Sequence, residues 1–156
     1  MKPVKVYTLV FVFRENQVLL GMKQRGFGQD HYMGFGGKLE LNETLYQCAV
    51  RELNEECGLI ANSLTKLGVI NFDYQGEEHI MEVHIYVTSD FDGVPVRSEE
   101  MDPKWFSVDN IPYDQMLRDS PYWFPKVLKN EKLNGFFEFD ENKKIINHSF
   151  NDISGV

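Results

Sequence analysis

The chain has 156 residues, of which 42% are apolar, 26% charged and 13% aromatic. This composition excludes disordered and fibrous proteins, and the length suits one domain over residues 1–156 that buries about 70% of its unfolded surface. A net charge of −8, from 24 acidic and 16 basic residues, excludes a general attraction to nucleic acid or to an anionic membrane. We therefore expect neither a nucleic-acid polymer nor a membrane as a partner.

The only cysteines are Cys48 and Cys57, which form neither a disulfide framework nor a zinc motif and so indicate a reducing compartment. Residues 1–13 resemble a signal peptide only superficially, because no small-residue cleavage site follows them. No apolar stretch approaches the roughly 18 residues that a membrane-spanning helix needs.

The first third of the chain predicts a hairpin, a loop and a helix. Residues 4–13 and 17–22 are rich in β-branched, aromatic and aliphatic side chains, and the polar residues 14–16 between them indicate a turn. Five glycines in residues 26–37 indicate a loop that bends sharply or closely approaches a ligand. A helix follows, with capping residues at 42–44 and a stop at 57–58.

The remainder predicts further strands and a second helix. Pro125 lies early in that helix, where proline is tolerated. The order of elements indicates one α+β domain, with helices packed on a mixed sheet. The predicted strands are 64–74, 80–89, 104–108, 136–139 and 144–148, and the predicted second helix is 121–133.

The first helix carries its acidic residues on an unexpected face. At about 100° per residue, Glu52 and Glu56 lie within roughly 20° of Leu45, on the stripe that should face the protein. A solvated set of acids would lie opposite that stripe. Carboxylates that crowd one another toward the interior are costly without a cation, and their hard oxygen atoms suit Mg²⁺ or Mn²⁺. The pattern therefore predicts a metal site for a polyphosphate ligand.

These residues resemble the signature of the Nudix hydrolases, which act on nucleoside diphosphates linked to another group. The resemblance implies an α/β/α sandwich around a mixed sheet, with the signature forming a loop, helix and loop. The matching positions are Gly37, Glu43, Arg51, Glu52, Leu53, Glu55, Glu56, Gly58 and Leu59.

The likeness continues outside this signature, toward animal members of the family that hydrolyse oxidised purine nucleoside triphosphates. It implies Mg²⁺-dependent hydrolysis of substrates such as 8-oxo-dGTP or 2-oxo-dATP to the monophosphate and pyrophosphate, with Mn²⁺ as a substitute. It also implies a cytoplasmic monomer, with mitochondrial and nuclear nucleotide pools left open. The matching segments are residues 7–10, 19–23, 25–28, 34–38 and 122–125.

The resemblance also implies roles for individual residues. Glu56 is the expected base or water-orienting group, and Arg51 is expected to orient the glutamates by salt bridges. The expected metal-binding residues are Gly36, Gly37, Glu52, Glu55, Glu56 and Glu100. The expected substrate-binding residues are Thr8, Lys23, Phe27, Met33, Phe35, Gly36, Gly37, Lys38, Phe72, Met81, Leu117, Asp119, Ser120 and Trp123.

Three of these positions depart from the family's base-recognition set. Met33 stands in place of an asparagine, Leu117 in place of a tryptophan, and Ser120 in place of an aspartate, whereas Asp119 remains. Two alternatives therefore stay open: a Nudix hydrolase of another nucleotide, such as a methylated purine dNTP or a nucleoside diphosphate conjugate, and a noncatalytic module that binds nucleotides or RNA ends. The complete set of Glu52, Glu55 and Glu56 argues against the second.

Overall fold

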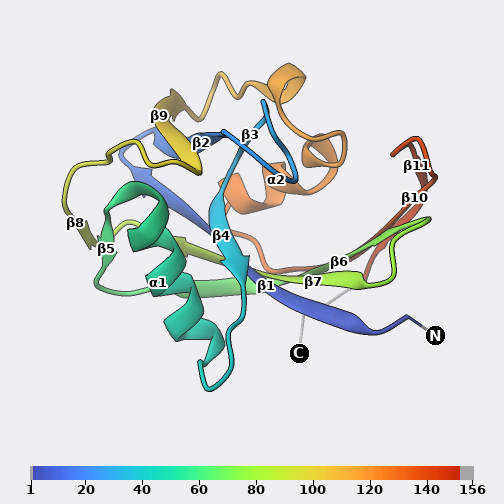
Figure 1. Cartoon of the computed structure of the whole chain (residues 1–156). Helices are drawn as coiled ribbons and strands as arrows, with labels where there is room; N and C mark the ends of the chain where they lie inside the picture. The colour runs from blue at the N-terminus through green and yellow to red at the C-terminus, as the bar shows by residue number, and fades with distance from the viewer. Residues whose placement is uncertain (1, 152–156) are drawn as a thin grey trace.

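The computed structural model describes residues 2–151. In that range, nine strands form one mixed sheet, and a two-stranded ribbon, two α-helices and a 3₁₀ turn complete the fold (Figure 1). The elements are β1 Val4–Arg14, β2 Gln17–Lys23, β3 Tyr32–Met33, β4 Phe35–Lys38, α1 Leu45–Cys57, β5 Ile60–Ala61, β6 Thr65–Tyr74, β7 Ile80–Thr88, β8 Phe91–Asp92, β9 Met101–Ser107, η1 Tyr113–Gln115, α2 Ser120–Leu128, β10 Leu133–Phe139 and β11 Ile145–Phe150.

Strand β1 organises the sheet because its two edges are used differently. One edge pairs in parallel with β7 over residues 4–12. The other edge pairs with β4 through residues 7–10 and with β2 through residues 12–14, both antiparallel. The sheet therefore divides at the middle of β1, and the strands on either side of the division carry the residues of the candidate site.

Alternate residues of β1 pack on opposite faces of the sheet, as the twofold repeat of a strand requires. Val10 and Val12 join the core cluster that contains Leu53 of α1. Phe11 points the other way and packs against Phe124 of α2, with 4.9 Å between ring centroids. The two helices thus cover opposite faces of the sheet, which confirms the predicted α/β/α sandwich with the acidic helix on one face.

Helix α1 is bounded by strong local signals at both ends. The Thr44 side chain accepts a hydrogen bond from the Gln47 amide, and the Gln47 side chain accepts one from the Thr44 amide, which completes a capping box. Gly58 has a φ of 80° and ends the helix by donating to the Asn54 carbonyl. These caps confirm the predicted helix and its limits.

The predicted strands were mostly confirmed, but the predicted glycine-rich loop and the predicted second helix differ from the structure. Within the predicted loop 26–37, residues 32–33 form β3 and residues 35–37 belong to β4, because they pair with β2 and β1. The predicted helix 121–133 ends at Leu128, because Asn130 takes a left-handed conformation with φ of 57° and Leu133 begins β10. Pro125 lies inside α2 rather than in its first turn.

Two small elements had no counterpart in the prediction. Each strand of the β5–β8 ribbon is only two residues long, and η1 is a single turn. Among residues 2–151, no helix combines the length and the apolar character required to cross a membrane.

Packing of α1 on the sheet generates a stability prediction. Leu53 is fully buried between α1 and the sheet, so Leu53→Ala should lower the free energy of unfolding by about 2–5 kcal/mol through lost transfer energy and a residual cavity. Leu41→Ala is the matched control, since Leu41 is 91% exposed and should change stability by less than about 0.5 kcal/mol. Urea unfolding curves measure both values, and equal effects of the two substitutions would contradict the packing described here.

Candidate active site

Two glycines of β4 allow α1 and β1 to approach closely. A methyl group at Gly36 would overlap the main chain of Thr8, and one at Gly37 would overlap the carboxylate of Glu52. Without these side chains, the Gly36 amide is free to donate a hydrogen bond of 3.0 Å to Glu56 Oε1. The acidic face of α1 is thereby placed directly against the backbone of β4.

A cleft of mainly charged residues opens beside this contact. Three glutamates of α1 line it, Glu52, Glu55 and Glu56, and the segment just before β9 contributes two more acids, Glu99 and Glu100. The spacing-based expectation that acids of α1 face the protein is thus met by Glu52 and Glu56, while Glu55 is more exposed. The lining residues are Lys23, Arg25, Gly36, Gly37, Glu52, Glu55, Glu56, Ser98, Glu99 and Glu100.

Arg51 holds several of the acids in place. Its guanidinium donates to Glu43 Oε2 at 2.6 Å, to Glu52 Oε1 at 2.7 Å and to Glu55 Oε2 at 3.2 Å. The hydrogen bond from Arg51 lowers the pKa of Glu43 to about 2. Arg51 therefore acts as a positioning residue for the carboxylates, and the sequence signal that could have identified Glu43 as its partner is its fixed place in the Nudix signature.

Burial gives Glu56 unusual electrostatic properties. Its side chain is 6% exposed, and desolvation raises its pKa to about 8 despite the hydrogen bond from Gly36. Burial also raises the pKa of Glu52. A carboxylate with few charged partners in a buried site is a natural ligand for a cation, because the cation compensates the cost of ionisation.

Glu100 is paired with two basic residues across the cleft. Lys23 Nζ donates to Glu100 Oε2 at 2.7 Å, and Arg25 Nε donates to Glu100 Oε1 at 2.6 Å. These hydrogen bonds lower the pKa of Glu100. Both carboxylate oxygens of Glu100 are therefore engaged, and the two basic side chains that engage them also line the cleft.

The donor set fits a hard divalent cation, although the carboxylates are not gathered around one point. Within the described residues, no three carboxylate, thiolate or imidazole side chains lie close enough to hold a single ion. The reason is visible in the ion pairs: Glu52 is turned toward Arg51, and Glu100 toward Lys23 and Arg25.

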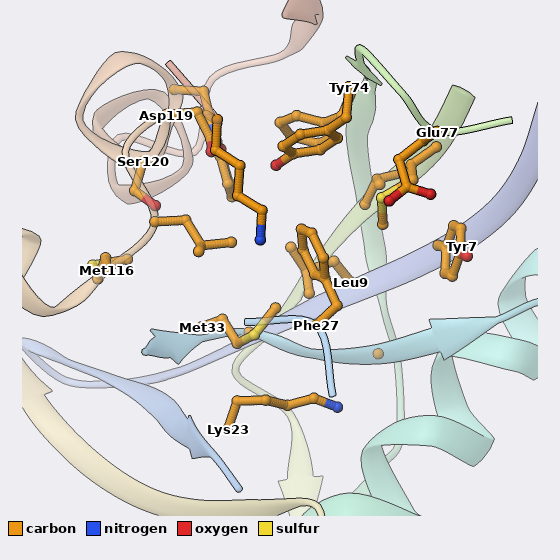
Figure 2. Close-up of a pocket in the computed structure, with 18 of the residues that line it drawn as sticks. Tyr7, Leu9, Lys23, Phe27, Met33, Tyr74, Glu77, Met116, Asp119 and Ser120 are labelled. Atoms are coloured by element: carbon orange, nitrogen blue, oxygen red, sulfur yellow. The ribbon is translucent and has the colours of Figure 1, made fainter. Parts of the chain in front are cut away.

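An apolar cavity of about 510 Å³ adjoins the cleft and shares Lys23, Gly36 and Gly37 with it. Its walls come from β1, the segment before β4, the β6–β7 hairpin, the start of α2 and the β10–β11 turn (Figure 2). The volume is typical of pockets that enclose a ligand of nucleoside size. Its aromatic and sulfur-containing lining residues are Tyr7, Phe11, Phe27, Tyr32, Met33, Phe72, Tyr74, Met81, Met116 and Trp123.

One buried acid lies in the wall of this cavity. Asp119 is 3% exposed, and its Oδ2 accepts a hydrogen bond of 2.7 Å from Trp123 Nε1. Burial raises the pKa of Asp119. Ser120, the next residue, is also buried and lines the same cavity. Asp119 therefore offers a polar contact in surroundings that are otherwise mainly apolar.

Most of the predicted substrate-binding residues line this cavity. Three differ in how they are placed. The Thr8 hydroxyl lies 3.3 Å from Cys48 Sγ, on the side of β1 that faces α1. Phe35 is fully buried in the core beneath α1, and Lys38 is exposed at the end of β4. Neither Phe35 nor Lys38 lines the cavity or the cleft.

Some cavity and cleft residues were missing from the sequence prediction. Arg25 lies beside Phe27 in a segment that had been singled out, and its charge was a usable signal. Tyr74 and Glu77 carried no such signal, because a tyrosine ending a strand and an acid in a turn are common surface features. Their positions depend on the pairing of β6 with β7 and β10.

Comparisons with known proteins show which proteins the chain is similar to in sequence and in fold. A model of the NUDIX domain matches residues 3–127. Oxidized purine nucleoside triphosphate hydrolase of Danio rerio is 44% identical over 97% of both chains, and that of Mus musculus is 42% identical over 98% of both. The crystal structure of a mutator MutT protein from Bacillus halodurans has a TM-score of 0.85 at 21% identity, covering 95% of this chain and 98% of that one, and so shows the same fold.

The raised pKa of Glu56 generates a prediction about stability and pH. The unfolded chain releases the Glu56 proton near its ordinary pKa of 4.5, whereas the folded protein retains it to about pH 8. Ionisation thus favours unfolding, so without divalent metal the wild type should lose stability relative to Glu56→Gln as pH rises from about 4.5 to about 8.

Thermal and urea unfolding in EDTA across this pH range measure the difference. By pH 8, the free energy of unfolding of Glu56→Gln should exceed that of the wild type by at least about 1 kcal/mol. This difference corresponds to a pKa shift of somewhat less than one unit. Glu131→Gln, at an exposed position, is the control and should follow the wild type. Parallel curves for the wild type and Glu56→Gln would show that the carboxylate is not destabilised by burial.

Proposed function

The chain belongs to the Nudix family, and from this premise we propose that it hydrolyses oxidised purine nucleoside triphosphates. The products are the nucleoside monophosphate and pyrophosphate, and the substrates include 8-oxo-dGTP and 2-oxo-dATP. The observation that carries the proposal is the junction of an aromatic cavity with an acidic cleft, which share Lys23, Gly36 and Gly37. The names of the relatives in Danio rerio and Mus musculus support the same substrate class.

In this proposal, one nucleotide occupies both compartments. The base enters the cavity, where Phe27, Phe72 and Trp123 offer aromatic surfaces and Asp119 offers a polar contact. The phosphates pass Gly36 and Gly37. Among the described residues, these two glycines and Lys23 are the ones that line both the cavity and the cleft. This arrangement brings the phosphate chain to the acids of α1.

Nudix hydrolases use divalent metal ions, and we propose Mg²⁺, with Mn²⁺ as a substitute. The residues that would hold it are Glu52, Glu55, Glu56 and Glu100, with main-chain oxygen atoms of Gly36 and Gly37. Such an ion, when bound, supplies positive charge to phosphate oxygens and makes water a better nucleophile. Oxygen ligands of this type suit Mg²⁺ and Mn²⁺ better than they suit softer metals.

Other steps of the proposed reaction depend on side chains of the protein itself. We assign Glu56 as the general base or water-orienting group, because it is buried in the cleft and held by the Gly36 amide. Arg51 keeps Glu52 and Glu55 oriented. Lys23 and Arg25 supply positive charge for the phosphates. We propose further that the enzyme acts as a monomer on free nucleotides in the cytoplasm.

A second candidate is a Nudix hydrolase for another nucleotide, such as a methylated purine dNTP or a nucleoside diphosphate conjugate. The observation that favours it is the lining of the cavity, where Met33 and Leu117 contribute no hydrogen-bonding side chain and Ser120 contributes only a hydroxyl. A noncatalytic binding module is disfavoured, because the acids of the cleft are all present.

Catalysis should depend on Glu56 and on a divalent metal. Glu56→Gln should lower kcat by at least about 100-fold while the fold is kept, as expected when a general base or metal ligand is lost. EDTA should abolish turnover of the wild type, and added Mg²⁺ should restore it. Steady-state kinetics with Glu131→Gln as the control test the assignment, and half of the wild-type activity in Glu56→Gln would refute it.

The bond that is broken should be the one between the α- and β-phosphates. A dNTP should then give dNMP and pyrophosphate, without orthophosphate unless a pyrophosphatase is added. Ion-exchange chromatography and ³¹P NMR of early time points identify the products directly. Early appearance of orthophosphate together with dNDP would show cleavage of the terminal phosphate instead.

Base preference should respond to the three altered cavity positions. The combined change Met33→Asn, Leu117→Trp and Ser120→Asp adds hydrogen-bonding groups and an aromatic contact. It should raise kcat/KM for 8-oxo-dGTP more than for dGTP, by roughly 10-fold to 100-fold, which corresponds to about 1.4–2.7 kcal/mol. An equal increase in kcat/KM for the two nucleotides, or no increase, would mean that other residues of the cavity recognise the base.

A further inference from the structure

Tyr74 places a fixed hydroxyl group in the cavity. Its ring is stacked on Phe139, with centroids 4.2 Å apart and planes at 6°, and it meets the edge of Phe27 at 5.7 Å. Figure 2 shows the hydroxyl end of the ring pointing into the cavity, toward the side where Asp119 lies. The ring is thus held on two sides by aromatic neighbours while its polar end faces the space for a ligand.

This hydroxyl group is available for binding. Among residues 2–151, no side chain or main-chain group forms a hydrogen bond with it, unlike the indole of Trp123, which donates to Asp119. Burial and the nearby Asp119 carboxylate both raise the pKa of Tyr74, so the phenol keeps its proton at neutral pH. Tyr74 therefore presents a neutral O–H donor that can also accept.

Several neighbouring side chains of the cavity cannot replace the Tyr74 hydroxyl as a hydrogen-bond donor. Met33, Met116 and Leu117 also line the cavity, and none of them offers a strong hydrogen bond. Figure 2 places Asp119, with Ser120 next to it, on the side toward which the Tyr74 hydroxyl points. The Tyr74 hydroxyl and the Asp119 carboxylate can together bind two neighbouring groups on the edge of a planar base.

We propose that Tyr74 and Asp119 together recognise the lactam edge of an oxopurine, in which a ring N–H lies next to a carbonyl oxygen. The Tyr74 hydroxyl donates to the carbonyl oxygen, and Asp119 accepts from the adjacent N–H. The inference rests on the proposed function, since it requires the base to occupy the cavity. It assigns Tyr74 as a specificity-determining residue and defines the substrate class by this edge.

The edge separates nucleotides into two groups. In 8-oxo-dGTP a ring N–H stands beside a carbonyl oxygen, whereas dATP presents an amino group beside a ring nitrogen that only accepts. A base without the lactam edge leaves a polar group of the cavity unpaired, and the penalty for such a group is the usual source of strong discrimination.

Tyr74→Phe tests the proposal because it deletes only the hydroxyl group and keeps both aromatic contacts. It should lower kcat/KM for 8-oxo-dGTP by about 5- to 10-fold, the range expected for one lost hydrogen bond, and change that for dATP by less than 2-fold. Tyr86→Phe is the matched control: Tyr86 is a buried tyrosine outside the cavity, and its loss should leave both substrates unchanged.

Binding of the monophosphates separates this test from the test of activity. Calorimetric titration of 8-oxo-dGMP and dAMP requires no turnover, and Tyr74→Phe should weaken only the binding of 8-oxo-dGMP, by a similar factor. An equal loss for both nucleotides, or no loss for either, would overturn the assignment of Tyr74. Absence of 8-oxo-dGTP hydrolysis by the wild type, with selective binding retained, would refute the proposed function and leave the recognition of the base intact.

Discussion

A carboxylate buried between α1 and β4 is the constraint on which the site depends. The Gly36 amide donates a hydrogen bond to Glu56, and side chains at Gly36 and Gly37 would overlap Thr8 and Glu52. Burial of an acid with so little compensation disfavours its ionised form. Burial of Glu56 therefore has an energetic cost that a cation bound in the cleft would offset.

The arrangement of charge around Glu56 extends this constraint. Arg51 orients the acids on one side of the cleft, and Lys23 and Arg25 engage Glu100 on the other. A protein with a net charge of −8 thus gathers basic side chains at the one place where the proposed phosphates pass. The adjoining cavity differs in character, since most of its lining surface is aromatic and aliphatic, although charged side chains such as Glu77, Asp119 and Lys143 also line it.

The acidic helix and most strands could be predicted from the sequence, because these features depend on local spacing. Thr44, Gly58 and the positions of Glu52 and Glu56 relative to Leu45 are all readable within one helix. By contrast, β4 is a strand because it pairs with β1. Tyr74 lines the cavity because β6, which carries it, pairs with strands distant in the sequence. Such long-range contacts leave no local signature. The end of α2 at Leu128 reflects the left-handed Asn130, which composition alone did not distinguish from a helical residue.

The most direct test of the account is a crystal structure of the protein with Mn²⁺ and 8-oxo-dGMP, in which anomalous scattering locates the metal. We predict that the metal lies in the cleft within coordination distance of Glu52 or Glu56, and that the base lies in the cavity between Phe27 and Trp123. The monophosphate should approach Gly36 and Gly37. A metal bound away from both glutamates, or a base outside the cavity, would contradict the proposal that one nucleotide spans the two compartments.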